Sequence, residues 1–179
     1  APLSKTPSVA KDDWSAYGER LTRFAEALKA RHGIALSYHA HLMMVVENEA
    51  EIDALMAHTG EAVGLLFDAG HVVAGGGDMA SLLARHGARI NHLHCKDIRG
   101  DVMARVRRED ISFNQGVRDG MFTVPGDGYL DFSPLIEFAT HADYQGWLIV
   151  EAEQDPRKAP PKEMAGIAYR HMTQLFENR

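Results

Sequence analysis

Short apolar runs alternate with amphipathic stretches along the whole chain. The runs are only as long as β-strands, whereas the stretches carry apolar residues at helical spacing, as Leu21, Phe24 and Leu28 do. The runs predict strands over Ile34–His41, Val63–Asp68, Ile90–Lys96 and Gly146–Glu151. The stretches predict helices over Lys11–Arg31, Glu47–Thr59, Met79–His86, from Asp131 or Ser133 to about His141, and over Met164–Phe176.

This alternation of helices with short apolar strands predicts a parallel sheet with helices outside it. No glycine-rich fingerprint follows the first strand, which disfavours a dinucleotide-binding domain. Gly75–Gly77 follows a strand but lacks the Lys-Ser/Thr of a phosphate loop. Polar residues follow the carboxyl end of each strand, where (β/α)8 barrels keep their sites. We therefore predict an α/β fold: one domain over residues 1–179 that holds four βα units of such a barrel.

The composition narrows the class of protein. A formal net charge of -6 disfavours a nucleic-acid or anionic-membrane partner, because phosphate binding needs concentrated Lys and Arg. No run approaches the roughly 18 apolar residues of a membrane span, and the first residues lack a signal-peptide core. The single cysteine excludes an internal disulfide framework and fits a reducing compartment. We therefore expect a cytoplasmic protein.

Side chains that bind metals stand at the ends of the predicted strands. His39 and His41 share one face of the first strand by its period of two, and His94 ends the third. Asp68 and Glu151 end the other two strands. Asp68 alone could equally cap the next turn, and a lone His94 would more often be a core residue. Together these five residues predict a site for Mn²⁺, Co²⁺, Fe²⁺ or Zn²⁺ rather than Ca²⁺.

Other polar residues near these strand ends have two interpretations each. Lys96 lies on the same strand face as His94. It is either a surface lysine or a group that holds a substrate oxygen or moves a proton. In the second case we expect burial and the metal to lower its pKa. Glu153 is either a solvated carboxylate or a group that contacts the metal ligands or the substrate. His92 is assigned to the interior, and Cys95, on the opposite face, to the helix layer as a small buried hydrophobe.

A long polar connection covers Arg99–Thr123. Asp101–Arg108 is predicted to be helical and the rest to be loop. Connections of this length inside a compact domain are usually functional or disordered. We expect this one to act as a lid that excludes water.

Five segments together resemble the xylose isomerase-like TIM-barrel superfamily and, within it, the myo-inosose-2 dehydratase family. They are Leu36–His41, Val63–His71, Ile90–Asp97, Phe122–Gly128 and Gly146–Asp155. Asp-x-Gly-His and His-x-Lys-Asp occur across the superfamily. The combination of His-Cys-Lys-Asp, Phe-Thr-Val-Pro-Gly-Asp-Gly and Val-Glu-Ala-Glu-Gln-Asp is specific to the dehydratases, and the resemblance covers nearly the whole chain.

The resemblance implies a set of site residues. Asp68, His94 and Glu151 would bind the metal, most simply Mn²⁺ or Co²⁺, with Zn²⁺, Fe²⁺ and Mg²⁺ as alternatives. The fourth ligand would come from the first strand, where many relatives carry Glu; we assign it to His39, with His41 as the alternative. His71 and Lys96 would transfer protons or orient the substrate, and His41, Arg99 and Glu153 would bind it. The chain departs from the family pattern at Ala40, Met43 and Met44, which puts the exact substrate in question.

The implied reaction is the removal of water from 2-keto-myo-inositol, giving a trihydroxycyclohexane-1,2-dione, in inositol catabolism. The rival functions are a metal-dependent ketose isomerase or epimerase that acts through the same enediolate, and a non-catalytic sugar-binding barrel. A DNA-repair nuclease on this fold is disfavoured by the negative charge. Members of the family are longer, so the chain would be the second half of the barrel. Such a half has open sheet edges, and we expect it to be poorly active alone or to pair with another chain, including a second copy.

Overall fold

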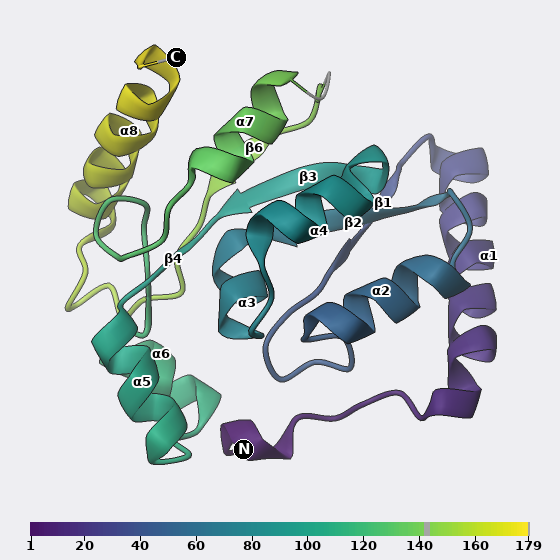
Figure 1. The fold of residues 1–179 in the computed structure, drawn as a ribbon, viewed down its shortest axis with the longest axis horizontal. Coiled ribbons are helices and arrows are strands. Elements are labelled where there is room, and N and C mark those ends of the chain that lie inside the picture. Colours follow the sequence, from purple (N-terminus) through teal and green to yellow (C-terminus); the bar gives the residue numbers. More distant parts are fainter. Residues whose placement is uncertain (142–143, 179) are drawn as a thin grey trace.

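The computed structural model describes residues 1–141 and 144–178, and its centre is a parallel sheet (Figure 1). The strands are β1 (Leu36–His39), β2 (Val63–Asp68), β3 (Ile90–Cys95) and β6 (Leu148–Val150), in the order β1-β2-β3-β6. The register sets Asp68 beside His94 and His94 beside Ile149. The predicted parallel sheet is confirmed, and three of its four strands are shorter than predicted.

Five long helices accompany the sheet, as predicted. They are α1 (Trp14–His32), α2 (Glu49–His58), α4 (Met79–His86), α7 (Ser133–His141) and α8 (Pro161–Glu177). Side chains set their ends: Asn48 and Glu51 form a capping box at the start of α2, and Asp78 accepts the backbone N–H of Ser81 at the start of α4. Gly33 ends α1 with a positive φ of 68°. None of the described helices is long and apolar enough to cross a membrane.

The two faces of the sheet differ in burial. Phe67, Leu93 and Cys95 are buried in the main apolar core, which the helices share. Full burial of one large apolar side chain contributes about 1.5–3 kcal/mol, so this face holds the sheet and helices together. The other face carries His92 and Ile149, which are half-buried or exposed. The predicted positions of Cys95 in the helix layer and of His92 on the opposite face are therefore confirmed.

Two short helices correct the prediction. The residues after β2 form α3 (Ala69–Ala74), and α6 (Phe113–Asp119) lies in a stretch predicted to be loop. Each is only about two turns long, so neither shows a clear apolar period, and each depends on a capping side chain, from Asp68 and Ser112 respectively. The predicted helix in the same connection is present as α5 (Gly100–Arg108).

The connection between β3 and α7 is therefore an ordered unit at the carboxyl end of the sheet (Figure 1). It consists of α5 and α6 and of a two-stranded antiparallel ribbon of β4 (Asp97–Ile98) and β5 (Phe122–Thr123). The N-terminal segment is bound to this unit, because Ser4 donates two hydrogen bonds to Asp110 and Pro2 bridges to Ser112. We call residues 97–123 the lid unit.

Candidate functional site

Four side chains converge at the carboxyl end of the sheet. His39 comes from β1, Asp68 from β2, His94 from β3, and Glu151 directly follows β6. Asp68 is central: its Oδ2 lies 3.5 Å from His39 Nε2 and 3.4 Å from His94 Nδ1. His94 Nδ1 lies 3.1 Å from Glu151 Oε2. We call these four residues the central cluster, and it forms because parallel strands end at the same edge of a sheet.

The same four atoms are buried and lack hydrogen bonds. His39 Nε2, Asp68 Oδ2, His94 Nδ1 and Glu151 Oε2 have no well-aligned hydrogen bond among the described residues, and only Glu151 Oε2 has a close cation, Lys96 Nζ at 3.0 Å. A buried polar atom without a partner costs roughly 1–3 kcal/mol, so this collection of atoms needs an explanation. The ligand atoms of Asp68, His94 and Glu151 lie within 4.8 Å of one another, and those of His39, Asp68 and His71 form a second such group that shares Asp68. Two imidazole nitrogens and two carboxylate oxygens are the donor set of a mixed N/O metal site. The residues present therefore fit a divalent cation.

The two carboxylate oxygens of Asp68 serve the two roles predicted for it, a helix cap and a metal ligand. Its Oδ1 caps α3 by accepting the backbone N–H of His71 at 2.9 Å, and its Oδ2 faces the central cluster. Burial opposes ionisation of this carboxyl, but the neighbouring His39 and His94 imidazoles outweigh burial and hold its pKa well below its usual range. The cap thus fixes an ionised carboxylate with one oxygen free.

Lys96 is fully buried beside the cluster. Its Nζ lies 3.0 Å from Glu151 Oε2 in an ion pair, 3.0 Å from Glu153 Oε2, and 3.6 Å from Asp68 Oδ2. Its stem packs on Gly70, where a Cβ would lie 2.7 Å from Lys96 Cγ. Burial favours the neutral amine, but the three carboxylates outweigh it and raise the pKa of Lys96. Burial thus acts in the expected direction but is outweighed by the carboxylates, and a lowered pKa beside a bound metal stays a prediction.

His71, Glu153 and His41 form a second layer around Lys96. His71 is buried, with its Nε2 at 2.9 Å from Lys96 Nζ and 3.5 Å from Glu153 Oε2. His41 Nε2 lies 3.8 Å from Glu153 Oε1. Burial lowers the pKa of His71 to about 4, whereas the pKa of Glu153 falls to about 2, because contact with His71 and Lys96 outweighs its burial. The structure thus places His39 in the central cluster and His41 beside Glu153.

Arg99 lies apart from these residues. Its guanidinium donates to Asp127 Oδ2 at 2.5 Å and to the carbonyl of Gly120 at 3.0 Å. These bonds tie the start of α5 to the end of α6 and to the loop after β5. Within the described residues, no contact between Arg99 and the central cluster is seen, so substrate binding by Arg99 stays a prediction.

Two kinds of residue near the site were missed in the sequence. Asp97 is buried and accepts backbone N–H groups of Ile98 at 2.7 Å and Leu130 at 3.0 Å, which holds the loop after β5. Phe113 of α6 lies with its ring 5.5 Å from that of His41, and Phe122 packs under Lys96. The Asp97 signal was present in the His-Cys-Lys-Asp motif; the aromatic contacts carry no local sequence signal.

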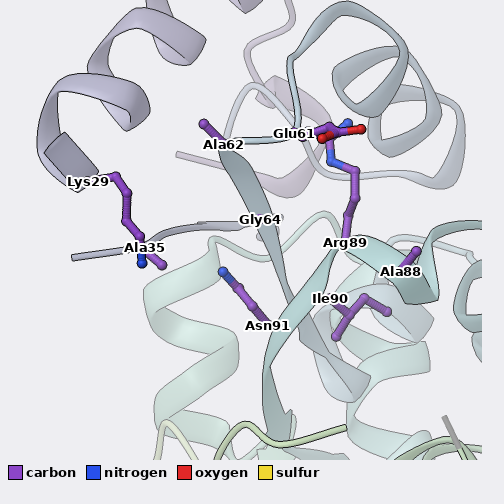
Figure 2. A pocket seen from close by; sticks show the side chains of 9 residues that line it. All are labelled: Lys29, Ala35, Glu61, Ala62, Gly64, Ala88, Arg89, Ile90 and Asn91. Carbon is purple, nitrogen blue, oxygen red and sulfur yellow. The ribbon is translucent and has the colours of Figure 1, made fainter. Parts of the chain in front are cut away.

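A cavity of about 660 Å³ lies at the opposite, amino end of the strands, and Figure 2 shows its lining. Two of its polar side chains, Arg89 and Asn91, are already engaged in hydrogen bonds. Arg89 donates to the backbone carbonyls of Met56, Thr59, Gly60 and Val63, and Asn91 donates to the carbonyl of Leu36. These donors hold the backbone, whereas the side chains of metal-ligand type gather at the carboxyl end of the strands.

Comparison with known proteins gives the following matches. The model of a family described as xylose isomerase-like TIM barrel matches residues 2–175. The rhizopine catabolism protein MocC of Rhizobium meliloti is 47% identical over 97% of this chain and 53% of its own length. Inosose dehydratases of Erwinia tasmaniensis and Lactiplantibacillus plantarum are 41% and 40% identical, over 97% and 98% of this chain and 59% and 61% of theirs. The chain therefore spans between half and two thirds of the length of these relatives.

Solved structures share the fold at lower identity. An IOLI protein with a bound zinc atom superposes with a TM-score of 0.68 at 19% identity, over 96% of this chain and 59% of that one. An L-ribulose 3-epimerase superposes with a TM-score of 0.68 at 16% identity, over 99% and 58%. These likenesses concern the fold alone.

Proposed function

Because the chain belongs to the xylose isomerase-like TIM barrel family, we propose that its central cluster binds one divalent metal ion and that the protein dehydrates an inosose. The reaction removes water from 2-keto-myo-inositol and gives a trihydroxycyclohexane-1,2-dione. The metal is assigned to Mn²⁺ or Co²⁺ first, with Zn²⁺, Fe²⁺ and Mg²⁺ as alternatives. The inosose dehydratases among the relatives support this choice of reaction.

The observation that carries the metal site is the set of four buried atoms without hydrogen bonds. His39, Asp68, His94 and Glu151 would hold the metal through those atoms. When bound, the metal would supply Lewis acidity toward a carbonyl and a neighbouring hydroxyl oxygen of the substrate. The Asp68 cap fixes one ligand in place, and the register of β2 and β3 fixes the spacing of another.

The chain's own residues account for the proton movements. Loss of water needs a base for the proton on the carbon next to the carbonyl and an acid for the departing hydroxyl. Lys96 suits the role of the acid, because its raised pKa keeps Nζ protonated. Its burial also restricts the side chain to one position. Glu153 orients Lys96 through the 3.0 Å hydrogen bond from Nζ to Oε2. The Phe113 ring of the lid unit lies against His41 and would exclude water.

The test is a dehydration assay on 2-keto-myo-inositol that follows the ultraviolet absorbance of the dione. With Mn²⁺ or Co²⁺ we expect absorbance to grow, slowly for the chain alone and faster where it associates with another chain, and a chelator should abolish the growth. Formation of an isomeric sugar without dione would favour the isomerase or epimerase alternative. No bound metal and no turnover would favour a sugar-binding barrel.

Two variants and two matched controls test the ligands. Asp68→Asn and His94→Gln should lose bound metal, measured by elemental analysis after dialysis. Asp12→Asn and His32→Gln change the same residue types at exposed positions, and we expect them to keep it. Metal retained at full occupancy in both cluster variants would refute the site.

A further inference from the structure

The segment that carries Glu151 and Glu153 follows the last strand without regular structure of its own. β6 ends at Val150, and residues 151–155 belong to no helix or strand. The backbone N–H of Glu151 donates to the carbonyl of Cys95 at 3.4 Å, and within the described part of the chain no backbone hydrogen bond of residues 152–154 is seen. Contacts of side chains therefore decide where the two carboxylates lie.

Gln154 makes such a contact with the lid unit. Its Nε2 lies 3.1 Å from Oγ1 of Thr123, a fully buried residue of β5. The same hydroxyl bonds to Oδ2 of Asp127, which also accepts a hydrogen bond from the guanidinium of Arg99. A chain of hydrogen bonds thus runs from Arg99 through Asp127 and Thr123 to Gln154. It joins the Phe-Thr-Val-Pro-Gly-Asp-Gly motif to the Val-Glu-Ala-Glu-Gln-Asp motif.

The direction of each bond in this chain follows from its members. The Asp127 carboxylate forms an ion pair with Arg99 and can only accept, so the single hydroxyl hydrogen of Thr123 points to Asp127. The Thr123 oxygen is then an acceptor toward Gln154, and the amide NH₂ of Gln154 is the donor. A glutamate carboxylate at this position would bring a second acceptor against Thr123. The position therefore suits an amide and disfavours an acid.

We propose that Thr123 and Gln154 are positioning residues, whose hydrogen bond ties the segment of residues 151–154 to the lid unit and so sets where Glu151 and Glu153 meet Lys96. We call this hydrogen bond the tether. Gln154 directly follows Glu153, so the tether limits how far the backbone at Glu153 can move. The role of Glu151 in metal binding rests on the proposed function, whereas the tether does not.

Lys96 does not fix the segment by itself. Its Nζ lies 3.0 Å from both Glu151 Oε2 and Glu153 Oε2, and 3.6 Å from Asp68 Oδ2. An ammonium among three carboxylates attracts each of them, so a loose segment could exchange one for another. Ala152 packs against a small apolar cluster, and such a contact is not directional. The tether supplies the direction that these contacts lack.

Backbone ¹⁵N relaxation of the metal-free chain tests the tether without any assumption about function. In the unaltered chain we expect order parameters of about 0.85 over residues 151–154. Thr123→Val keeps the shape of the side chain without its hydroxyl, and Gln154→Glu keeps the shape without the donor. Both should lower the order parameters of the segment below about 0.6. Thr123→Ser restores the hydroxyl and should restore the unaltered values.

A matched control removes another bond between the same loop and the lid unit. Lys158 Nζ donates to the carbonyl of Arg118 at 2.7 Å, at an exposed position. Lys158→Ala should leave the order parameters of residues 151–154 unchanged. Unchanged values in both Thr123→Val and Gln154→Glu, or an equal fall in Lys158→Ala, would overturn the proposal. If Thr123→Val does not fold, Gln154→Glu decides the question, because Gln154 is only half-buried.

Calorimetric titration with Mn²⁺ gives a second readout. Thr123→Val and Gln154→Glu should weaken Mn²⁺ binding about tenfold, as is typical when a group that orients a metal ligand is lost. Thr123→Ser and Lys158→Ala should bind as the unaltered chain does. Unchanged affinity in the two tether variants would refute the positioning of Glu151. If the unaltered chain binds no Mn²⁺, the proposed metal site fails, and the order parameters alone decide on the tether.

Discussion

The positive charge of Lys96 lies beside His71 and Glu153, which could otherwise bind a second cation. Its Nζ contacts Glu151 of the central cluster and also Glu153 and His71, whose ligand atoms lie within 4.8 Å of His41 as well. Two-metal sites hold their ions about 3.5–4 Å apart, bridged by such carboxylates. The Lys96 ammonium therefore neutralises the Glu153 carboxylate, at the position where a second metal ion would otherwise bind.

We predict one metal equivalent per chain, measured by elemental analysis at saturating Mn²⁺. The reason is charge: a second divalent ion would meet the Lys96 ammonium at contact distance. Lys96→Arg keeps the charge and should also bind one equivalent, whereas Lys96→Ala should bind a second, weaker one. Two equivalents in the unaltered chain would contradict this explanation.

Protons compete with the metal at His94. Burial opposes protonation of this ring, but the carboxylates of Asp68 and Glu151 raise its pKa to about 9. His94 is then protonated near neutral pH, and a metal ion must displace that proton to reach Nδ1. Asp68 has a lowered pKa and is ionised already, so it releases none.

Metal affinity should therefore rise with pH by about tenfold per unit between pH 7 and 9, and level off above the pKa of His94. Calorimetric titrations of Mn²⁺ in two buffers of different ionisation enthalpy should show about one proton released per metal bound at pH 7. His32→Gln, a change at an exposed histidine, should leave this number unchanged. Metal binding without proton release would show that His94 is not protonated.

At the scale of elements, Asp97 ties the lid unit to the loop after β5. Its carboxylate accepts the backbone N–H of Ile98 and of Leu130 through one oxygen and that of Gly126, at 3.3 Å, through the other. The side chain is 1% exposed, so burial raises the pKa of Asp97 although these bonds oppose it. The loop between β5 and α7 thus depends on one side chain of β4.

Asp97→Ala should lower the free energy of unfolding by about 1–3 kcal/mol, because it leaves buried N–H groups without an acceptor. Asp97→Asn keeps one oxygen and should lose less. Urea unfolding measures both, and amide hydrogen exchange should show faster exchange at Gly126 and Leu130. Asp101→Ala at the exposed start of α5 serves as the control. An Asp97→Ala chain as stable as the control would exclude this anchoring role.

The helices and strands also show which elements can be predicted from sequence patterns alone. The long helices and the strands were predicted because their apolar periods span several turns or a whole buried run, as in α4 and β2. α3 and α6 were missed because each is short and its stability comes from one capping side chain and from tertiary contacts. Sequence periodicity has no access to such contacts.

At the scale of the whole molecule, the sheet has two edges, β1 and β6. Beside β6, a groove of about 530 Å³ is lined by apolar side chains of β6 and α8, including Val150 and Tyr169. Trp147, Ile149 and Tyr169 are exposed. An apolar edge strand of this kind is a template for pairing with further strands.

We expect the 179-residue chain to be poorly active alone, or to associate with another chain through this edge, because the apolar edge strand β6 is open to pairing. Light scattering coupled to size exclusion should show a mass that rises with concentration. Val150→Lys places a charge on the edge and should reduce association, whereas Lys162→Ala on the exposed start of α8 should not. A monomeric and fully active chain would contradict the expectation.

The sequence alone determined the class of fold, the resemblance to the family and the residue types at the strand ends, because these depend on local periodicity and on short motifs. The tertiary structure decided how the strand ends combine: His39 reaches Asp68, His41 reaches Glu153, and Lys96 is buried. It also decided that the backbone of Leu42 contacts the rings of both His41 and His71. Distances between atoms far apart in the chain follow from strand register and side-chain rotamers, which no local pattern encodes.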